Sequence, residues 1–444
     1  MEVLVADPGA RGHALARKIA ESNLVERVFM APGNPGTTEI AENTGLEHTD
    51  IAGQIDFVRK NKNIGLVVQS ADNPLALGAV NTFEEQFDGD DRELYVWGPT
   101  KEAAEIESSK VFSKEMMSKL EIPTAHYGVF NSTLAAIAYA RDRSFPQFAK
   151  EDGLASGKGV DKANNIQELS KCLYELVRAG KLGKEQRIVI EDGLKGPEIS
   201  LQAWCDGENY SMVPFAMKDH KTIGDNDTGP MTGGMAVIGP VPCITREDIE
   251  SFGERFVAPV LQELSRQGRP FKGMLYPGLK GWKCLEYNAR PGDSEAQVWA
   301  ALLQSDIVEL MLACCMGELD QIDKPVWKNA SAACIVLAAE GYPVNPKKGA
   351  LIHGLDSEFA ENTHMLHAGT RMEGQDVVVD GGRVLNVVTV GDDGENLETV
   401  IQSAYRDAEK IKFTGKQTRG DVGQEVLTTE FIEYVNRSRE NDWH

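Results

Sequence analysis

The chain has 444 residues, of which 41% are hydrophobic, and its formal net charge at pH 7 is −22. This length predicts about three domains, and the apolar fraction suffices for ordinary globular cores. Such an acidic chain is poorly suited to nucleic acid or an anionic membrane as its main partner, although a local basic pocket can still bind an anionic small molecule. The seven cysteines contain no C-x-x-C pair, the first residues read as a strand rather than a signal peptide, and no apolar run has transmembrane length. We therefore expect a soluble, cytoplasmic protein with neither a nucleic-acid nor a membrane partner.

The first hundred residues alternate between short apolar strands and helical or turn-rich segments. Strands are expected at residues 2–6, 28–31, 64–68 and 95–97, and a helical pattern covers residues 14–19. This alternation predicts an open α/β sheet, in which ligands lie at the carboxyl ends of the strands. The polar residues that follow the strands, and are therefore candidates for ligand contact, are Arg11, Asn34 and Asp72. The glycines at positions 9 and 12 suit either a phosphate at a helix N-terminus or a plain strand–helix turn.

A second region combines lysines with a glycine-rich loop. Residues 102–120 are expected to form one helix that carries Lys110, and a strand at residues 145–150 ends in Lys150. The loop that follows, E-D-G-L-A-S-G-K-G-V, contains Gly153, Ser156, Gly157, Lys158 and Gly159. Backbone N–H groups freed by glycine, with a lysine nearby, can cradle a phosphate, although the spacing is not that of a P-loop. A flexible glycine-rich hairpin is the alternative.

Residues 187–234 contain further charged candidates. A strand at residues 187–191 ends in Glu191, and Glu198 follows seven residues later. Residues 218–234 read as one uninterrupted loop, and a loop of that length is more often functional or disordered than decorative. Its mixture of charged residues and paired glycines favours anion binding, and the candidates are Lys218, His220, Lys221, Asp227, Thr228, Gly233 and Gly234.

The segment from Cys284 to Asp293, C-L-E-Y-N-A-R-P-G-D, alternates between apolar and polar residues, as a half-buried strand does. Glu286 and Asn288 lie two residues apart, which places both on one face of a strand. A carboxylate and an amide oxygen are hard ligands that suit Mg²⁺. Arg290 is expected on the same face, so that a phosphoryl group would meet a metal on one side and a guanidinium on the other. The alternative is a surface strand with mixed polar residues.

The last part of the chain is expected to be a small, strand-rich domain. An apolar helical pattern at residues 300–317 closes the middle region, and its Met and Leu residues are most simply core. A buried strand at residues 332–339, several later strands and one helix at residues 395–411 follow. The charged tail after residue 426 reads as a helix or as a loose segment.

Taken together, these motifs resemble those of the ATP-grasp fold and, more narrowly, the phosphoribosylamine–glycine ligase family, also called glycinamide ribonucleotide synthetase. The resemblance covers residues 1–425 and rests on A-P-G-N-P-G-T, D-G-L-A-S-G-K-G-V, D-H-K-T-I-G-D-N-D-T-G-P-M-T-G-G-M, L-E-Y-N-A-R-P-G-D, A-E-G-Y-P, H-A-G-T and G-G-R-V-L. It implies a multidomain protein of mixed α/β and α+β class. The expected parts are an N-terminal open α/β domain (1–101), an ATP-grasp domain (102–325) with a lid subdomain at about 122–192, a C-terminal domain (326–425) and a charged tail (426–444).

The resemblance also implies a function and a role for each candidate residue. The protein would join glycine to phosphoribosylamine in purine biosynthesis, through a glycyl phosphate made with ATP. Lys110, Lys150 and the lid loop 153–160 would contact the phosphates, Glu191 would start the strand that meets the adenine, and Glu198 would bind the ribose. Glu286 and Asn288 would hold Mg²⁺ or Mn²⁺, and Arg290, Lys150 and Asp219 would be the catalytic residues. The loop 219–234, with Asn34 and the turn around Asp72, would bind glycine and phosphoribosylamine.

The sequence departs from the family pattern mostly on the acceptor side. Gly12 replaces a glutamate of the first loop, Asp72 replaces a glutamate, and Thr222 replaces an arginine whose charge Lys218 could supply. Two other functions are therefore kept as alternatives: a divergent ligase with another acceptor, and a non-catalytic paralogue that binds nucleotide. A surface role for Lys218 also stays open. We expect a monomer or a weak dimer.

Overall fold

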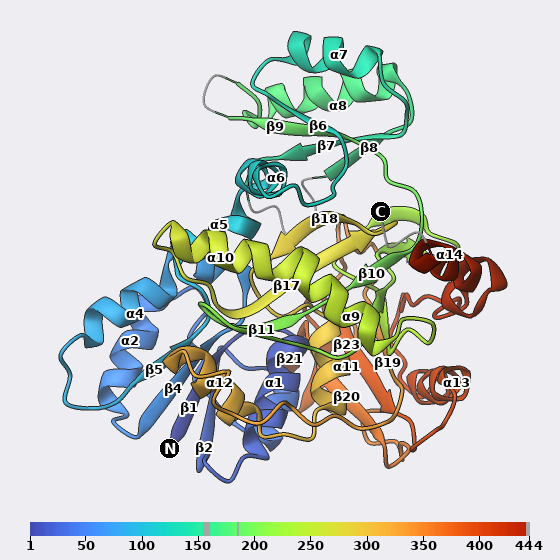
Figure 1. The fold of residues 1–444 in the computed structure, drawn as a ribbon. Helices are drawn as coiled ribbons and strands as arrows, with labels where there is room; N and C mark the ends of the chain where they lie inside the picture. The colour runs from blue at the N-terminus through green and yellow to red at the C-terminus, as the bar shows by residue number, and fades with distance from the viewer. Residues whose placement is uncertain (154–159, 184–185, 441–444) are drawn as a thin grey trace.

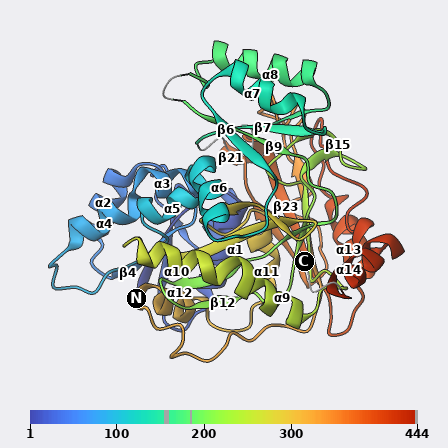
Figure 2. The same cartoon turned by 45° about the horizontal axis from the view of Figure 1, so that its top comes forward.

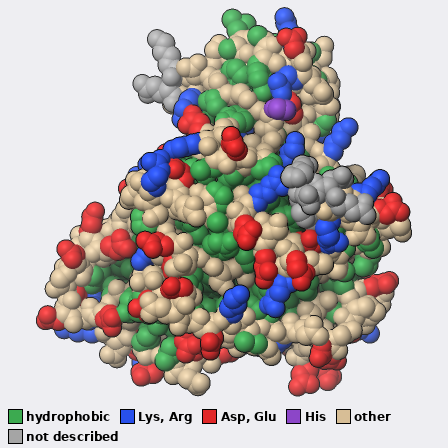
Figure 3. Space-filling model, viewed as in Figure 1, with side chains coloured by type: hydrophobic (Ala, Val, Ile, Leu, Met, Phe, Trp, Pro, Cys, Tyr) green, Lys and Arg blue, Asp and Glu red, His purple; other side chains and the backbone are tan. Residues whose placement is uncertain are grey.

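The computed structural model describes residues 1–153, 160–183 and 186–440. Figure 1 shows a broad body with a smaller lobe above it, and the N-terminal and C-terminal parts of the chain lie on opposite sides of that body. Among the described residues, no helix is long and apolar enough to cross a membrane. Acidic side chains are spread over the face shown in Figure 3, as expected from the net charge.

The N-terminal part is an open sheet of five parallel strands in the order β3-β2-β1-β4-β5, as the sequence predicts. The strands are β1 (Glu2–Ala6), β2 (Arg27–Ala31), β3 (Glu42–Asn43), β4 (Ile64–Gln69) and β5 (Tyr95–Trp97), and the helices are α1 (Ala10–Ala20), η1 (Pro35–Glu39), α2 (Ile51–Lys60), α3 (Asp72–Leu77) and α4 (Ala79–Phe87). Helices pack on both faces, since Val3 and Val5 share a core with α1 while Leu4 shares one with α2 and α4. The carboxyl ends of β1 and β4, where such sheets bind ligands, point toward the middle of the molecule.

The upper lobe is a four-stranded antiparallel sheet in the order β6-β9-β7-β8. It contains β6 (Tyr127–Phe130), α7 (Thr133–Arg141), β7 (Gln147–Glu151), β8 (Val160–Ala163), α8 (Ile166–Arg178) and β9 (Ile188–Asp192). Apolar residues of α7, α8 and β9 form a small core of its own. Figures 1 and 2 both show this lobe standing apart from the body and joined to it by chain segments on either side of the lobe sequence. The lobe is therefore a unit with its own core.

The middle of the body is a second five-stranded sheet. Four of its strands lie in the order β10-β17-β11-β12, and the fifth, β18, pairs with β17 outside that order. Its strands are β10 (Glu198–Ser200), β11 (Ala203–Asp206), β12 (Tyr210–Met212), β17 (Lys272–Lys280) and β18 (Lys283–Asn288). Around it lie α5 (Lys101–Ser108), α6 (Lys110–Lys119), α9 (Arg246–Phe252), η2 (Gly253–Val257), α10 (Ala258–Arg266), α11 (Glu295–Leu302) and α12 (Ile307–Met316).

Two helices that the sequence predicts as continuous are each broken in the structure. The prediction of one helix at 102–120 is wrong because Ser109 has an extended backbone and its side chain accepts a hydrogen bond from Phe112 N–H, capping α6. The prediction of one helix at 300–317 is wrong for a similar reason, since Asp306 caps α12 after an extended residue at Leu303. Local caps thus overrule the apolar periodicity.

A third sheet joins the middle of the chain to its C-terminal part, in the order β13-β16-β19-β23-β20. Its strands are β13 (Lys218–Asp219), β16 (Ala236–Gly239), β19 (Ala332–Ala338), β20 (Thr363–His367) and β23 (Arg383–Val390), and it is accompanied by the hairpins β14 (Thr222–Gly224)–β15 (Thr228–Met231) and β21 (Thr370–Glu373)–β22 (Asp376–Val379). The prediction of an uninterrupted loop at 218–234 is therefore wrong, because most of the segment pairs as strands despite its glycines.

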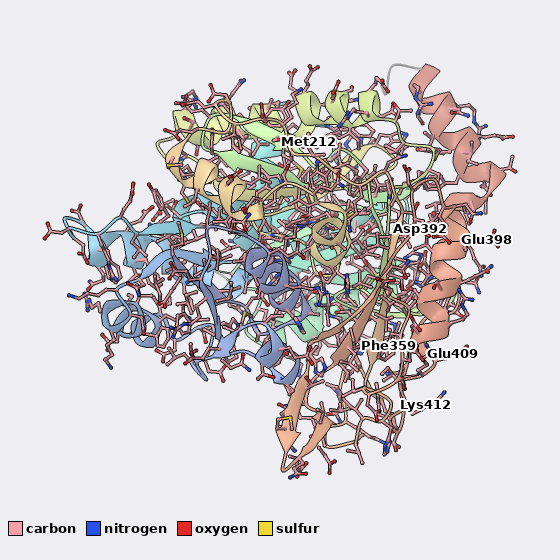
Figure 4. The ribbon with its side chains drawn as sticks, turned by 90° about the horizontal axis from the view of Figure 1, so that it is seen from below. Met212, Phe359, Asp392, Glu398, Glu409 and Lys412 are labelled. Carbon is pink, nitrogen blue, oxygen red and sulfur yellow. The ribbon has the colours of Figure 1, made fainter. Side chains whose placement is uncertain are left out.

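The C-terminal helices α13 (Leu397–Ala408) and α14 (Thr429–Glu440) follow, with the short η3 (Glu425–Leu427) between them. Figures 1 and 2 place both on the side opposite the N-terminal sheet, and Figure 4 shows Glu398 and Glu409 near the two ends of α13 at the edge of the molecule. The charged tail therefore begins as a helix.

Candidate nucleotide and acceptor site

Glu286 and Asn288 lie on β18, opposite Gly278 and Tyr276 of β17. A bulge at Leu285 shifts the register, so that Cys284 and Tyr287 both face the core while Glu286 keeps 27% of its side chain exposed. A Cβ added at Gly278 would find its nearest neighbours, both in Glu286, at 3.9 and 4.0 Å, so there is room beside the carboxylate. The strand thus carries two hard oxygen donors, a partly exposed Glu286 and a buried Asn288.

Three lysines surround Glu286. Lys110 Nζ donates to Glu286 Oε2 at 3.3 Å. Lys110 first, and then Lys221 and Lys150 against the effect of burial, lower the pKa of Glu286, so the carboxylate is ionised at neutral pH. Among the described residues, no group of three or more His, Cys, Asp and Glu side chains could hold a metal ion by itself. Glu286 and Asn288 suit a hard cation such as Mg²⁺, which binds few protein ligands and is also bound by substrate phosphates.

Arg290 does not continue the face of β18, so that expectation is wrong: the strand ends at Asn288 and Arg290 lies in the turn that follows. Its guanidinium pairs with Glu107 of α5 at 3.0 Å and donates to Pro291 O at 3.1 Å. Glu107, which the sequence did not single out, also accepts from Ala289 N–H at 2.7 Å. Arg290 is therefore held at the site from a neighbouring helix rather than by strand alternation.

Glu191, at the end of the lobe sheet, is buried between two lysines. Lys114 Nζ lies 2.6 Å from Glu191 Oε2, and Lys150 pairs with the other oxygen. Burial opposes the charge on the glutamate, but Lys150 and Lys114 together lower its pKa. Lys114 was missed by the sequence reasoning, although it lies four residues after Lys110 and therefore on the same helix face. The side chain of Glu191 is thus occupied by lysines from α6 and β7.

Glu198 of β10 lies on the other side of the site. Lys221 Nζ lies 2.8 Å from Glu198 Oε1, and Lys280 Nζ lies 3.3 Å from Oε2. Burial would raise the pKa of Glu198, but Lys221 and then Lys280 outweigh it and lower the pKa to about 2. Glu191, Glu198 and Glu286 therefore each pair with one or two lysines.

Asp219 and Glu295 are two buried acidic residues that interact next to this set. Glu295 Oε1 accepts from Tyr276 Oη at 2.6 Å and from Ser200 Oγ at 2.7 Å. Burial, and next the charge of Glu295, raises the pKa of Asp219 to about 8. Asp219 Oδ1 has no hydrogen-bond partner in the described part of the chain. Because Gly234 has a φ of +109° and an added Cβ would lie 2.9 Å from that oxygen, only glycine fits there.

The predicted acceptor residues separate into two groups. Lys221, Gly233 and Gly234 lie at the site, and Gly233 is held by Tyr342, whose hydroxyl accepts from its N–H at 3.0 Å, and by Arg383, which donates to its carbonyl at 2.5 Å. Lys218, His220 and Asp227 instead face the C-terminal segment, while Thr228 lies in an exposed strand.

Lys218 is the clearest case of that second group. Its Nζ lies 2.6 Å from Glu425 Oε2, and only 7% of the side chain is exposed. The alternative of a solvated surface lysine is therefore wrong. The charge of Lys218 is thus paired with a carboxylate of the C-terminal segment, and its contact with an anionic ligand stays a prediction.

Asn34 and Asp72, from the N-terminal sheet, also differ from each other. Asn34 caps η1 by accepting from Gly36 and Thr37 N–H at 3.0 and 3.2 Å, and it donates to His367 O at 3.0 Å. This side chain supports a turn, with little left to offer a ligand. Asp72 is the first residue of α3; burial would raise its pKa, but the charges of Arg290 and then Arg11 outweigh burial and lower it.

The lid loop is described only at its edge. Gly153 lies in a turn with open space around it. The neighbouring Asp152 accepts from Ser109 Oγ at 2.8 Å, which ties the lobe to the start of α6. The predicted phosphate contacts at Ser156, Gly157, Lys158 and Gly159 lie outside the described residues.

The lobe, the paired lysines and the Glu286–Asn288 strand define an ATP-grasp protein. The 2-oxoglutarate carboxylase biotin carboxylase domain of Hydrogenobacter thermophilus, whose structure contains MgADP, has the same fold: the TM-score is 0.70 and the match covers 99% of this chain and 97% of that one, at 16% identity. The structure of phosphoribosylamine–glycine ligase from Thermotoga maritima matches with a TM-score of 0.76 and 31% identity over 94% of this chain and 99% of that one.

Three family models for phosphoribosylglycinamide synthetase match the chain. The N domain matches residues 1–107, the ATP-grasp (A) domain residues 108–296 and the C domain residues 332–425. Curated phosphoribosylamine–glycine ligases from Vibrio vulnificus and Allochromatium vinosum are each 38% identical to it over 439 residues, which is 97% of this chain and 99% and 100% of theirs. The chain belongs to the phosphoribosylglycinamide synthetase family.

Proposed function

We propose that the protein is an ATP-dependent ligase that joins glycine to 5-phosphoribosylamine, giving glycinamide ribonucleotide, ADP and phosphate in purine biosynthesis. The match to named ligases over nearly the whole of both chains supports this reaction. The structural observation that carries it is the group of Lys110, Lys150 and Lys221 around the ionised Glu286. That arrangement suits a polyphosphate and a cation together.

The chemistry explains why such a site is needed. A carboxylate does not acylate an amine at neutral pH, because oxide is a poor leaving group. Transfer of a phosphoryl group from ATP to glycine gives an acyl phosphate, which the amine of phosphoribosylamine then attacks. Phosphoryl transfer depends on positioning and charge neutralisation more than on covalent help.

In this mechanism Lys110 and Lys150 leave their glutamates and bind the phosphates of ATP. Glu286 and Asn288 would hold Mg²⁺ or Mn²⁺, which when bound would supply neutralisation of the transferring charge. Arg290, held by Glu107, faces the phosphoryl group. Glu191 would keep Lys114 when Lys150 departs, so that its own buried charge stays paired.

Asp219 is placed to handle the proton of the attacking amine. A buried carboxyl with a raised pKa is a better proton acceptor than an ordinary aspartate when it is ionised. Its Oδ1 lies beside Gly234 in the loop that we assign to the acceptor, together with Lys221 and Gly233. We assign Asp72, which Arg290 and Arg11 hold ionised, to the same side of the site.

Several further assignments are part of this proposal. The domain limits are 1–101, 102–325 and 326–425, with the lid at about 122–192. All seven cysteines are unpaired, which agrees with a reducing, cytoplasmic location. We propose a monomer or weak dimer, and the lid loop as a phosphate cover.

Release of ADP tests the reaction. With ATP and Mg²⁺, both glycine and phosphoribosylamine should be required for sustained ADP release, and the product should be glycinamide ribonucleotide. Release with another amino acid or amine, but not with these two, would favour the divergent ligase that the changes at Gly12, Asp72 and Thr222 allow. Nucleotide binding without any turnover would favour a non-catalytic paralogue.

A further inference from the structure

A short C-terminal segment, Arg419–Glu425, contacts the hairpin β14–β15 and the residues just before it through several hydrogen bonds and ion pairs. Arg419 Nη1 donates to Thr222 Oγ1 and to Asp227 Oδ1, both at 2.8 Å. Gly420 N–H donates to Asp225 Oδ1 at 2.7 Å, and Asp421 Oδ2 accepts from Asn226 N–H at 2.8 Å. Gly423 N–H donates to His220 Nε2 at 3.1 Å, and Lys218 pairs with Glu425 at 2.6 Å. These contacts join two segments separated by about two hundred residues.

Arg419 lies at the centre of this contact. Its side chain is only 2% exposed, and the second half of its fork pairs with Asp421, with Nη2 2.6 Å from Oδ2. A guanidinium presents donors in a fixed plane, so it fixes the relative position of Asp227, Asp421 and Thr222 in a way that a lysine does not. Position 222 is also where the family pattern has an arginine, and here a threonine accepts from Arg419 instead.

The hairpin connects the contacts of Arg419 to the site through its backbone. Thr232, just after β15, donates through both its N–H and its hydroxyl to Lys221 O at 2.7 Å. Lys221 then reaches Glu198, and the strand before it carries Asp219 against Gly234. The opposite end of the loop is fixed by Tyr342 and Arg383 at Gly233. Residues 219–234 are thus clamped at both ends by C-terminal side chains.

We propose that Arg419 is a positioning residue for the acceptor side of the site: by holding hairpin β14–β15 through Thr222 and Asp227, it sets where Lys221, Asp219 and Gly234 lie. It does not touch a substrate, since its fork is fully engaged by Asp227, Asp421 and Thr222. This inference rests on the proposed function in so far as it names phosphoribosylamine as the molecule that this loop binds.

The test compares Arg419→Met and Arg419→Lys with the parent enzyme in ADP-release kinetics. Arg419→Met should raise the KM for phosphoribosylamine about tenfold or more, because small displacements of positioning groups have large kinetic effects. The KM for ATP should stay within about threefold, since Lys110, Lys150 and the lobe lie on other elements. Arg419→Lys keeps the charge but loses the forked guanidinium, so its KM for phosphoribosylamine should lie between those of the parent enzyme and Arg419→Met.

Two further variants separate positioning from general stability. Asp227→Asn removes the charge of a partner whose side chain is 65% exposed, so it should fold normally and still raise the KM for phosphoribosylamine in the same direction. The matched control is Arg371→Met, because Arg371 also contacts two carboxylates, Glu373 and Asp380, but lies outside this contact. It should leave every KM unchanged.

Hydrogen exchange gives a readout that does not depend on the identity of the acceptor. In Arg419→Met, amides of residues 222–234 should exchange faster while those of β6 and β7 in the lobe stay as in the parent. Unchanged exchange in the hairpin, or an unchanged KM for phosphoribosylamine with only a lower melting temperature, overturns the inference. If the parent itself needs no phosphoribosylamine, the proposed function fails. Faster hydrogen exchange in the hairpin of Arg419→Met would still support the positioning role of Arg419.

Discussion

The nucleotide side and the acceptor side of the site use the same residue types in different ways. On the nucleotide side, Lys110 and Lys150 are each paired with a glutamate of the site, so an incoming polyphosphate can replace that partner. On the acceptor side, Lys218 and Asp227 are paired with Glu425 and Arg419, which come from the C-terminal segment. Those pairs join the loop to the C-terminal segment.

This difference shows that a charged residue in a motif can be a ligand or a support. A partly exposed pair such as Lys110–Glu286 exchanges a partner at modest cost, because both groups remain close to the incoming charge. A pair that joins two segments of the backbone loses a structural constraint when it opens. The following predictions test which charged residues bind a ligand and which support the backbone, beginning with the largest expected effect.

Glu286→Gln should reduce kcat/KM by about a hundredfold to a thousandfold, the range seen when a group that stabilises the transition state is removed. The strand should remain folded, because 27% of this side chain is exposed and its neighbour Lys110 can turn to solvent. ADP release measured across a Mg²⁺ titration checks this. Glu409→Gln, at the exposed end of α13 (Figure 4), is the control and should behave as the parent. Near-normal turnover at ordinary Mg²⁺ would remove Glu286 from the metal site.

Glu191→Gln should lower the free energy of unfolding by about 3–5 kcal/mol, because it leaves buried lysines without their carboxylate. Denaturant unfolding measures this loss. Lys114→Met combined with Glu191→Gln should recover part of it, since one unpaired buried charge is then absent. A single variant within about 1 kcal/mol of the parent would contradict the buried pairing.

Stability should fall as the pH decreases from 6.5 toward 4. Burial, followed by Lys218 and Arg419, lowers the pKa of His220 to about 4, and burial lowers the pKa of His364 and His367 to about 4 as well. Over this window the unfolded chain binds more protons than the folded one, so protonation favours unfolding. His220 alone should account for about 3 kcal/mol, given about 1.4 kcal/mol per pKa unit.

Unfolding by urea between pH 4 and pH 8 measures this dependence, and His220→Gln should flatten it. At neutral pH the His220 ring is expected to carry its proton on Nδ1, near Ala236 O, and to accept from Gly423 N–H through Nε2. A pH profile unchanged by the substitution would place the effect at the other histidines.

Lys218→Ala should leave the KM for ATP unchanged, raise the KM for phosphoribosylamine less than Arg419→Met does, and lower stability by about 1 kcal/mol, because its pair with Glu425 is one of several contacts that hold the loop. A double-mutant cycle with Glu425→Ala should give a coupling energy of about 1 kcal/mol. A raised KM for phosphoribosylamine in Lys218→Ala, with no coupling to Glu425, would instead indicate that Lys218 binds the acceptor and does not support the loop.

Much of the architecture followed from local pattern. The strand–turn–helix alternation of the first hundred residues predicted the open α/β sheet, because strands buried on both faces read as apolar runs between turns. Motifs such as L-E-Y-N-A-R-P-G-D pointed to the family, which the comparisons confirm. Errors arose where one local interaction outweighed periodicity, as at Ser109, whose cap divides a predicted helix, and at residues 218–234, whose glycines concealed strand pairing.

The sequence by itself determined the residue types of the site and their spacing along single strands, as at Glu286 and Asn288, because strand geometry converts spacing directly into a shared face. Only the tertiary structure decided which charges meet across the chain. Glu107 holding Arg290, Lys114 sharing Glu191 and Arg419 locking Asp227 join separate elements, and the last pair spans 192 residues. Such pairs depend on the packing of whole sheets and helices, so no local spacing encodes them, and they separate the residues free to bind a ligand from those already bound to the protein.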